Sequence, residues 1–511
     1  LFIIGTLVIF YDAVKKFSVK NRVILNGFFV LFIIGFVFSK YSPTSILDGD
    51  SFFSKLIYIG SLLIFGLLLG YLITKAHIKK DEKILQDFKD IDFIYILMLA
   101  FAFWGIVSMR GAIRLLFIIS PIVPLISSFF FVRILNYWEE NRQDGLKKLA
   151  AGIVTCIIIA IMIITFVSYS VGTIYSVKAT VPGVYEQQWQ QAMSWVRENT
   201  PMGSVFVHWW DYGYWVQTIG QRPTVTDGGH FIEYWPHLTG RYVLTTPYPE
   251  TALSFMKTHN VSYLLIDSTD LGKYGAYSSI GSDETGEDRL SQIPVMVYNP
   301  SQSRETNTSN IRVYQGGVFV DEDIFYGENE KQIFLPSNNA VMGGVIIDTS
   351  KNESRTLQPQ GVFIYNQKQI IIPIRYVYFD NQLVDFGGGL NATVKIIPSV
   401  DQNTGTLTID RAGAAIYLSP KVSKGLFAQL YLLNDGFKKY PTVNLAHAEQ
   451  DALIKNLNAQ GADLGEFAYF GGLRGPIKIW KIDYPNNIIE REEFLRTSGG
   501  YGELDNLTFT R

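Results

Sequence analysis

The run Leu149–Ser170, LAAGIVTCIIIAIMIITFVSYS, decides the fold class of this chain. It contains no charged residue, and about 20 apolar residues in a helix cross a hydrocarbon core of roughly 30 Å. Four similar runs precede it in the sequence. They are Val23–Ser39, Leu56–Thr74, Ile91–Met109 and Ile113–Val132. A single run of this kind could be a buried helix of a soluble protein, but five in succession predict a multi-span α-helical membrane bundle.

The start of the chain continues this pattern. Leu1–Phe10 is apolar from its first residue, and Leu1 is not an initiator Met. We therefore expect a fragment that begins inside a further membrane helix. The net charge of −2 and the 48% hydrophobic content argue against both a nucleic-acid-binding protein and a disordered chain. The single cysteine, Cys156, excludes an intrachain disulfide and favours a prokaryotic cell envelope.

Lysine and arginine residues indicate the orientation of the bundle. The loops at 15–22, 75–89 and 133–148 are rich in them, whereas the alternating loops at 40–55 and 110–112 are poorer. Positively charged loops tend to stay on the cytoplasmic side. The alternation therefore predicts a multi-pass protein of the cell membrane whose residues after Ser170 are extracytoplasmic.

The residues after Ser170 have the pattern of a soluble domain. A helix, a strand, a second helix and a buried strand are expected in turn at Tyr185–Thr200, Ser204–Val207, Pro249–His259 and Val261–Asp267. This order predicts a mixed α/β core. From about Asn339, segments in which apolar and polar residues alternate predict the strands of an appended β-rich module. We divide the chain into a bundle at 1–172, a core at 173–338 and a module at 339–511. C-terminal segments, including a helix around Val422–Leu433, are expected to return to the core.

The pentapeptide Trp209-Trp210-Asp211-Tyr212-Gly213 directly follows the first strand of the core. Adjacent aromatic residues are commonly part of a hydrophobic core. A carboxylate between them is costly if it is buried without a partner. Indole N–H groups donate hydrogen bonds and a carboxylate accepts them. The motif therefore predicts a pocket that can bind a hydroxyl group and reject a ligand that lacks it.

This motif, WWDYG, resembles the signature of the catalytic subunit of oligosaccharyltransferase, and the archaeal and bacterial single-subunit enzymes are the most similar. The resemblance implies the C-terminal part of a GT-C-type fold. It also implies transfer of an oligosaccharide from a dolichyl-type polyprenyl phosphate or pyrophosphate to the asparagine of Asn-X-Ser/Thr sequons. In this family, WWDYG binds the hydroxyl of the third sequon residue. The implied partners are the lipid-linked donor, acceptor proteins and the lipid membrane, with the enzyme acting as a single subunit and without nucleic acid.

A second family motif has Asp, then Lys three residues later, and Met or Ile after four more. Asp270 and Lys273 match its first two positions and follow the buried strand, whereas Tyr277 occupies the third. Asp435 and Lys438 have the same spacing but lie outside the core. The resemblance therefore assigns Asp270 and Lys273 to the sequon-binding site, beside Trp209, Trp210, Asp211, Tyr212 and Gly213.

Arg114 stands near the start of an apolar run, on the outer side of the predicted bundle. One interpretation is that it reaches the membrane interface. The other, which matches an arginine of the family, is a contact with the phosphate of the lipid-linked donor.

The resemblance also implies a Mn²⁺ or Mg²⁺ cofactor, which neutralises the departing phosphate. The family takes its ligands mainly from acidic loops that this chain lacks and from a glutamate of an outer loop. The corresponding stretch, 39–44, has Lys40 at the acidic position. We therefore assign no catalytic and no metal-binding residue, and we expect the fragment alone to be inactive.

Three other interpretations remain. A sugar transferase acting on Ser or Thr would share the bundle but lack WWDYG. A transporter is disfavoured by the large soluble part. A catalytically silent paralogue that binds sequons, or that acts as a scaffold in the envelope, is favoured by Lys40.

Overall fold

The computed structural model describes residues 1–42, 44–111, 115–140, 145–180, 185–307, 309–327, 332–350, 358–403 and 406–500. The chain divides into two compact units, Leu1–Ala179 and Thr180–Arg511. The predicted fold class, a membrane-type helical bundle followed by a soluble part that contains an α/β core and a β-rich region, is confirmed.

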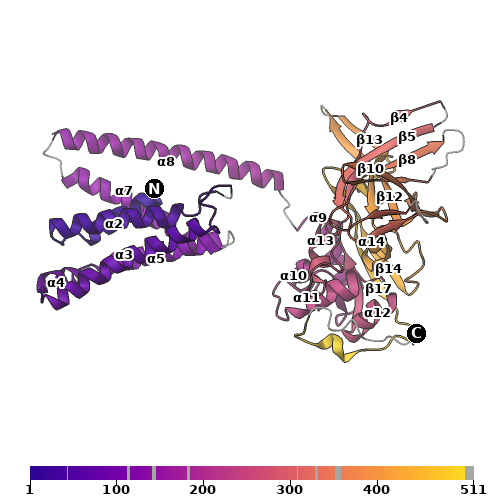
Figure 1. Ribbon diagram of the computed structural model, residues 1–511, viewed down its shortest axis with the longest axis horizontal. Helices are drawn as coiled ribbons and strands as arrows, with labels where there is room; N and C mark the ends of the chain where they lie inside the picture. The colour runs from indigo at the N-terminus through magenta and orange to yellow at the C-terminus, as the bar shows by residue number, and fades with distance from the viewer. Residues whose placement is uncertain are drawn as a thin grey trace. The chain divides into compact units, whose positions relative to one another are not determined.

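The regular elements in the described part of the first unit are helices. Its helices are α1 (Phe2–Ala13), α2 (Val19–Phe38), α3 (Phe52–Ile78), α4 (Glu82–Lys89), α5 (Phe93–Gly111), α6 (Leu116–Ile119), α7 (Ile122–Glu140) and α8 (Gly145–Thr180). Among the described residues, five segments are long and apolar enough to cross a membrane, and they coincide with the five predicted runs. α1 packs against α2, α5 and α7, and α2 packs against α3 (Figure 1).

Local sequence signals explain where several of these helices begin. The hydroxyl of Ser18 accepts a hydrogen bond from the Asn21 N–H at the start of α2, and the Ser51 hydroxyl accepts one from Ser54 at the start of α3. Such caps satisfy backbone donors that have no partner within the helix. Pro121 separates α6 from α7 because proline cannot donate the hydrogen bond that would continue the helix.

The α/β core of the second unit surrounds a four-stranded sheet with the order β1-β2-β17-β14. Its strands are β1 (Val205–Val207), β2 (Val261–Ile266), β14 (Val443–Glu449) and β17 (Ile477–Ile482). The helical segments of this region are α9 (Gln187–Asn199), η2 (Trp210–Tyr212), α10 (Gly213–Thr218), α11 (Tyr234–Thr239), η3 (Gly240–Leu244), α12 (Pro249–Thr258), α13 (Asp270–Ile280) and η6 (Glu492–Leu495). A further helix, α15 (Ala452–Ala459), packs instead with Val400 and Ala468. The predicted helices and strands of the core are therefore present, with boundaries shifted by a few residues.

A larger, eleven-stranded sheet forms the β-rich region. Its strands are β3 (Val295–Tyr298), β4 (Arg304–Glu305), β5 (Ser309–Phe319), β8 (Val341–Ser350), β9 (Gln360–Tyr365), β10 (Lys368–Phe379), β11 (Gln382–Asp385), β12 (Leu390–Asn403), β13 (Thr406–Leu418), β15 (Ala468–Tyr469) and β16 (Leu473–Arg474). A separate hairpin consists of β6 (Ile324–Tyr326) and β7 (Ile333–Leu335).

This sheet begins at Val295, earlier in the chain than residue 339, where the sequence indicated the start of the module. β3 is four residues long, too short for its alternation to stand out. It takes its place in the sheet by pairing with β13, which is distant in sequence.

The helix expected around Val422–Leu433 is divided into α14 (Pro420–Lys424) and a π-helix, η5 (Phe427–Leu432). Gly425 lies between them with an extended backbone. Phe427, Leu430 and Tyr431 pack into the same hydrophobic core as β1 and β2, so this segment does return to the core.

Candidate functional site

The WWDYG loop leaves the end of β1 and turns at once into α10. Gly213 starts that helix where the chain passes Asp227, and a Cβ atom at this position would lie 2.4 Å from the Asp227 Cβ. No side chain fits at that distance, which explains the glycine of the motif. Thr224 forms a bridge with Phe206 of β1, so the segment 224–230 runs beside the motif.

Tyr212 is the buried anchor of the loop. Its hydroxyl donates to Asp270 Oδ1 at 2.8 Å and lies 2.9 Å from Thr269 Oγ1. Its ring stacks on Trp189 of α9, with the centroids 4.9 Å apart. These contacts join the motif to the start of α13.

Asp267 and Asp270 form an acidic pair beneath Tyr212. Asp267 accepts hydrogen bonds from the Trp189 indole and from the Thr269 backbone and hydroxyl. Burial, with the nearby Asp267 charge as a second cause, raises the pKa of Asp270 to about 7. Asp267 was not among the predicted site residues, although its place at the end of the buried β2 strand, three residues before Asp270, is a signal that could have identified it.

Lys273 connects this buried layer to Asp211. Its Nζ lies 2.8 Å from Asp211 Oδ2 and donates to the Tyr212 hydroxyl at 3.0 Å. About 30% of each side chain in the Lys273–Asp211 pair remains exposed. Asp270 and Lys273 are one turn apart on α13 and reach the motif from the same face. The structure thus brings the two predicted motifs together.

Trp210 lies at the outer side of the loop. Its indole N–H is buried and has no hydrogen-bond partner among the described residues. Its ring meets His230 edge to face, with the centroids 4.5 Å apart. Trp209 is almost completely buried and packs on Trp210 and on Tyr277. The Tyr277 hydroxyl is likewise buried without a partner in the described part of the chain.

The alternative pair, Asp435 and Lys438, does not resemble a ligand site. The Asp435 carboxylate accepts hydrogen bonds from the backbone N–H groups of Lys439 and Tyr440 and so holds a turn. Asp270 and Lys273 are therefore the pair that contacts WWDYG.

Arg114, the predicted contact for the donor phosphate, lies outside the described residues. The nearby Arg110 at the end of α5 is engaged within the bundle. It donates to the Ser39 hydroxyl at 2.7 Å and to the Gly49 carbonyl at 3.4 Å, and it stacks over the Tyr58 ring. Arg110 therefore secures the loop between α2 and α3.

This α2–α3 loop does not fit a divalent cation. Lys40 donates to the Arg110 carbonyl, and the Asp48 carboxylate already accepts hydrogen bonds from the N–H groups of Asp50 and Ser51. These backbone hydrogen bonds lower the pKa of Asp48. Among the described residues, no three acidic, histidine or cysteine side chains gather as a metal site would require.

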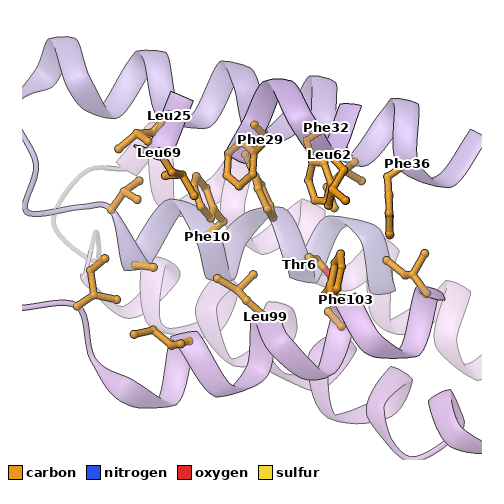
Figure 2. A pocket seen from close by; sticks show the side chains of 18 of the residues that line it. Thr6, Phe10, Leu25, Phe29, Phe32, Phe36, Leu62, Leu69, Leu99 and Phe103 are labelled. Atoms are coloured by element: carbon orange, nitrogen blue, oxygen red, sulfur yellow. The ribbon is translucent and has the colours of Figure 1, made fainter. Parts of the chain in front are cut away.

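The helical bundle forms a partly open apolar cavity of about 340 Å³ (Figure 2). Phe10, Phe29, Phe32, Phe36 and Phe103 point into it from three helices. Thr6 contributes a hydroxyl, but this group already donates to the Phe2 carbonyl. The cavity therefore suits a hydrocarbon group and offers no site for a charged one.

Comparison with known proteins links part of this chain to glycosyltransferases, although no family model matches it. Over 172 residues the chain is 30% identical to dolichyl-phosphooligosaccharide-protein glycotransferase 1 of Pyrococcus furiosus, covering 33% of this chain and 17% of the relative. The enzyme of the same name from Pyrococcus horikoshii is 28% identical over 198 residues, covering 36% and 19%.

Among solved structures, an Archaeoglobus fulgidus oligosaccharyltransferase tethered with an acceptor peptide containing the NVT sequon aligns with a TM-score of 0.38 and 14% identity. That alignment covers 94% of this chain and 64% of the other. The matched segments span less than a fifth of each curated relative. The sequence similarity nevertheless confirms the resemblance that WWDYG indicated.

Proposed function

We propose that this chain, which is similar to oligosaccharyltransferases, belongs to an enzyme that transfers an oligosaccharide from a dolichyl-type phosphate or pyrophosphate to the asparagine of Asn-X-Ser/Thr sequons. Trp209, Trp210 and Asp211 bind the hydroxyl of the third sequon residue, and Tyr212, Gly213, Asp270 and Lys273 hold them in place. The soluble unit lies outside the cytoplasm, where the enzyme meets its acceptor proteins.

One observation carries this proposal: a buried indole donor and a partly exposed carboxylate belong to adjacent residues of one loop. The Trp210 N–H has no partner among the described residues. Asp211 uses one oxygen for Lys273 and keeps part of its surface exposed. A hydroxyl group can accept from the indole and donate to the carboxylate at the same time. A methyl group can do neither, so a peptide with Ala in the third position leaves both groups unpaired.

The membrane unit supports a lipid-linked donor. Its helices are long enough to cross a bilayer, and the apolar cavity between them can take a hydrocarbon chain. Arg114 contacts the phosphate of the donor in this proposal. The Mn²⁺ or Mg²⁺ that the resemblance implies does not fit the residues around Asp48, whose carboxylate is already engaged by backbone N–H groups.

The test is a competition experiment on the full-length protein that contains this chain. A fluorescent Asn-X-Thr peptide and lipid-linked donor are supplied, and unlabelled Asn-X-Thr, Asn-X-Ser and Asn-X-Ala peptides compete for the acceptor site. We expect the Ala peptide to compete roughly a hundredfold more weakly, because two or three unpaired polar groups cost about 1–3 kcal/mol each. Equal competition by all three peptides would remove the sequon-reading role of WWDYG.

The second candidate is a silent paralogue that binds sequons without transfer, and the position of Lys40 favours it. The same preparation distinguishes the two functions. A silent paralogue gives the same ranking of peptides in a binding assay but forms no glycopeptide from labelled donor. Formation of glycopeptide establishes the enzyme.

A further inference from the structure

A second cavity, which is polar, lies within the β-rich region, apart from the WWDYG loop. Its volume is about 260 Å³, close to the lower end of the roughly 300–1,000 Å³ typical of small-molecule sites. The side chains that matter for its chemistry are Tyr378, Lys395, Arg411, Asp463, Glu466 and Phe467. They come from β10, β12, β13 and the segment before β15, so the sheet itself positions them.

Lys395 is the most unusual member of this cavity. Only 4% of the residue is exposed. Its Nζ donates to the Leu432 carbonyl at 2.6 Å and lies 4.3 Å and 4.7 Å from the ring centroids of Tyr378 and Phe467. None of the carboxylates in the described part of the chain lies within 4 Å of it. A buried ammonium group without a carboxylate partner is costly.

The neighbouring charges do not supply the missing counter-ion. Glu466 is committed to Lys478, whose Nζ lies 2.8 Å from its carboxylate, and to the Asn434 amide. Asp463 pairs with Arg411 at 3.0 Å on the exposed rim. Burial, reinforced by the Lys478 charge, lowers the pKa of Lys395 to about 7. Asp380 also lines the cavity, so the described lining has no overall excess of cations. What it contains is a buried ammonium group, Lys395, that has no carboxylate partner of its own.

We propose that this cavity binds a small carboxylate-bearing ligand, no larger than about one sugar ring, whose carboxylate pairs with Lys395 and Arg411. Arg411 can accept this role without releasing Asp463, because a guanidinium group has five N–H donors. Tyr378 and Phe467 provide flat apolar surfaces for the body of the ligand. A metal ion is not the expected occupant, because the described residues contain no group of three suitable ligands.

Protonation should be linked to this binding. The charged groups that face Lys395 are Lys478 on β17 and Glu466, with Arg411, Asp463 and Asp380 further along the cavity wall. A bound carboxylate favours the ammonium form of Lys395, so binding takes up a proton near neutral pH. Affinity should then fall as pH rises above 7, approaching tenfold per pH unit.

The experiment uses ligand-observed NMR titrations of the full chain in detergent micelles with acetate, glucuronate and glucose. We expect glucuronate to bind at pH 6 and to bind at least tenfold more weakly at pH 9, while glucose, which lacks the carboxylate, binds at least tenfold more weakly at either pH. Binding of acetate as tightly as glucuronate identifies a general carboxylate site, and tighter binding of glucuronate identifies an acidic sugar. Both results support the proposal.

Variants separate this cavity from nonspecific binding. Lys395→Met keeps the length of the side chain without its charge and should weaken glucuronate binding at least tenfold, whereas the exposed Lys368→Met should not. Arg411→Ala should weaken it several-fold, and its matched control is Arg375→Ala, from another surface ion pair of the same sheet. Arg411 is exposed, so this comparison remains decisive even if Lys395→Met fails to fold. Equal binding of glucose, or no effect of Arg411→Ala, would overturn the proposal.

Discussion

The two sides of the WWDYG loop differ in how completely their polar groups are paired. On the inner side, the Tyr212 hydroxyl, Asp267 and Asp270 exchange hydrogen bonds with one another and with Thr269. On the outer side, the Trp210 N–H has no partner among the described residues, and the Asp211 side chain is partly exposed. Five consecutive residues therefore combine a structural anchor with polar groups whose hydrogen-bonding capacity is not fully used within the described residues. Lys273 joins the two sides, because it touches both Tyr212 and Asp211.

The largest expected effect is on the outer side. Asp211→Ala in the full-length enzyme should lower the turnover of sequon peptides by about a hundredfold or more. The substitution removes the carboxylate that accepts from the hydroxyl of the third sequon residue and from the Lys273 ammonium group, so both donors are left without an acceptor. Thermal unfolding should change little. The matched control is Asp410→Ala, which breaks the Arg312–Asp410 pair of similar length and exposure in the β-rich region. If both variants lose stability equally and the folded Asp211→Ala enzyme stays active, the outer side is structural as well.

On the inner side we expect a pH effect on stability. The pKa of Asp270 is about 7 in the folded chain and about 3.9 in an unfolded one. Between these values the folded state binds more protons, so the free energy of unfolding should fall as pH rises from 5 to 8, by on the order of 2 kcal/mol. Asp270→Asn keeps the shape and cannot titrate, although its amide nitrogen cannot accept the second of the two hydrogen bonds that Asp270 accepts from Tyr212 and from the Asp267 N–H. The comparison therefore concerns the pH dependence of stability and not its absolute value. Unfolding temperatures of both proteins across this range provide the measurement, and identical pH profiles would argue against a neutral Asp270.

Trp210→Phe tests whether the indole donor itself matters. The substitution keeps an aromatic ring but removes the N–H, so peptide affinity should fall about tenfold, the equivalent of one hydrogen bond of roughly 1.4 kcal/mol. Trp195→Phe serves as the control, because Trp195 is a half-buried tryptophan of α9 that stacks on His447, away from the motif. Competition with the Asn-X-Thr peptide gives the affinity. An unchanged value would place the hydroxyl contact elsewhere in the loop.

The smallest effect concerns Tyr277, whose hydroxyl is buried without a partner among the described residues. Tyr277→Phe should raise the free energy of unfolding by about 1 kcal/mol, because it removes an unpaired polar group without leaving a cavity. Peptide affinity should stay constant. A loss of affinity for Asn-X-Thr would instead show that this hydroxyl contacts the acceptor, and the boundary between the two sides of the loop would then have to move.

The sequence predicted the membrane helices and the order of core elements because long apolar runs and a buried strand leave unambiguous periodic signals. It also predicted that the segment with Asp270 and Lys273 packs beside WWDYG. It could not separate the inner from the outer side of the loop. That distinction depends on Asp267 and Thr269, whose contacts with Tyr212 exist only after folding.

The sequence also contained no signal that predicts the cavity around Lys395. A lysine that alternates with apolar residues along a strand is typical of a solvent-exposed position. Lys395 follows that pattern on β12 but is covered by Phe467 and Leu432, which come from other parts of the chain. Tertiary packing decides whether a strand face meets solvent or another layer. The alternation of residues along the strand does not contain that information.

The order of strands in the core sheet has a consequence for biosynthesis. β2, the neighbour of the strand that leads into WWDYG, pairs on its other side with β17, and Lys478 lies opposite Ile266, more than 200 residues earlier. While the ribosome is still producing the β-rich region, one edge of β2 has no partner and can pair with foreign strands. The loop that we assign to sequon recognition is therefore completed late in translation. We expect nascent chains to depend on chaperones during that interval, and a chain interrupted before β17 to lack an ordered WWDYG loop.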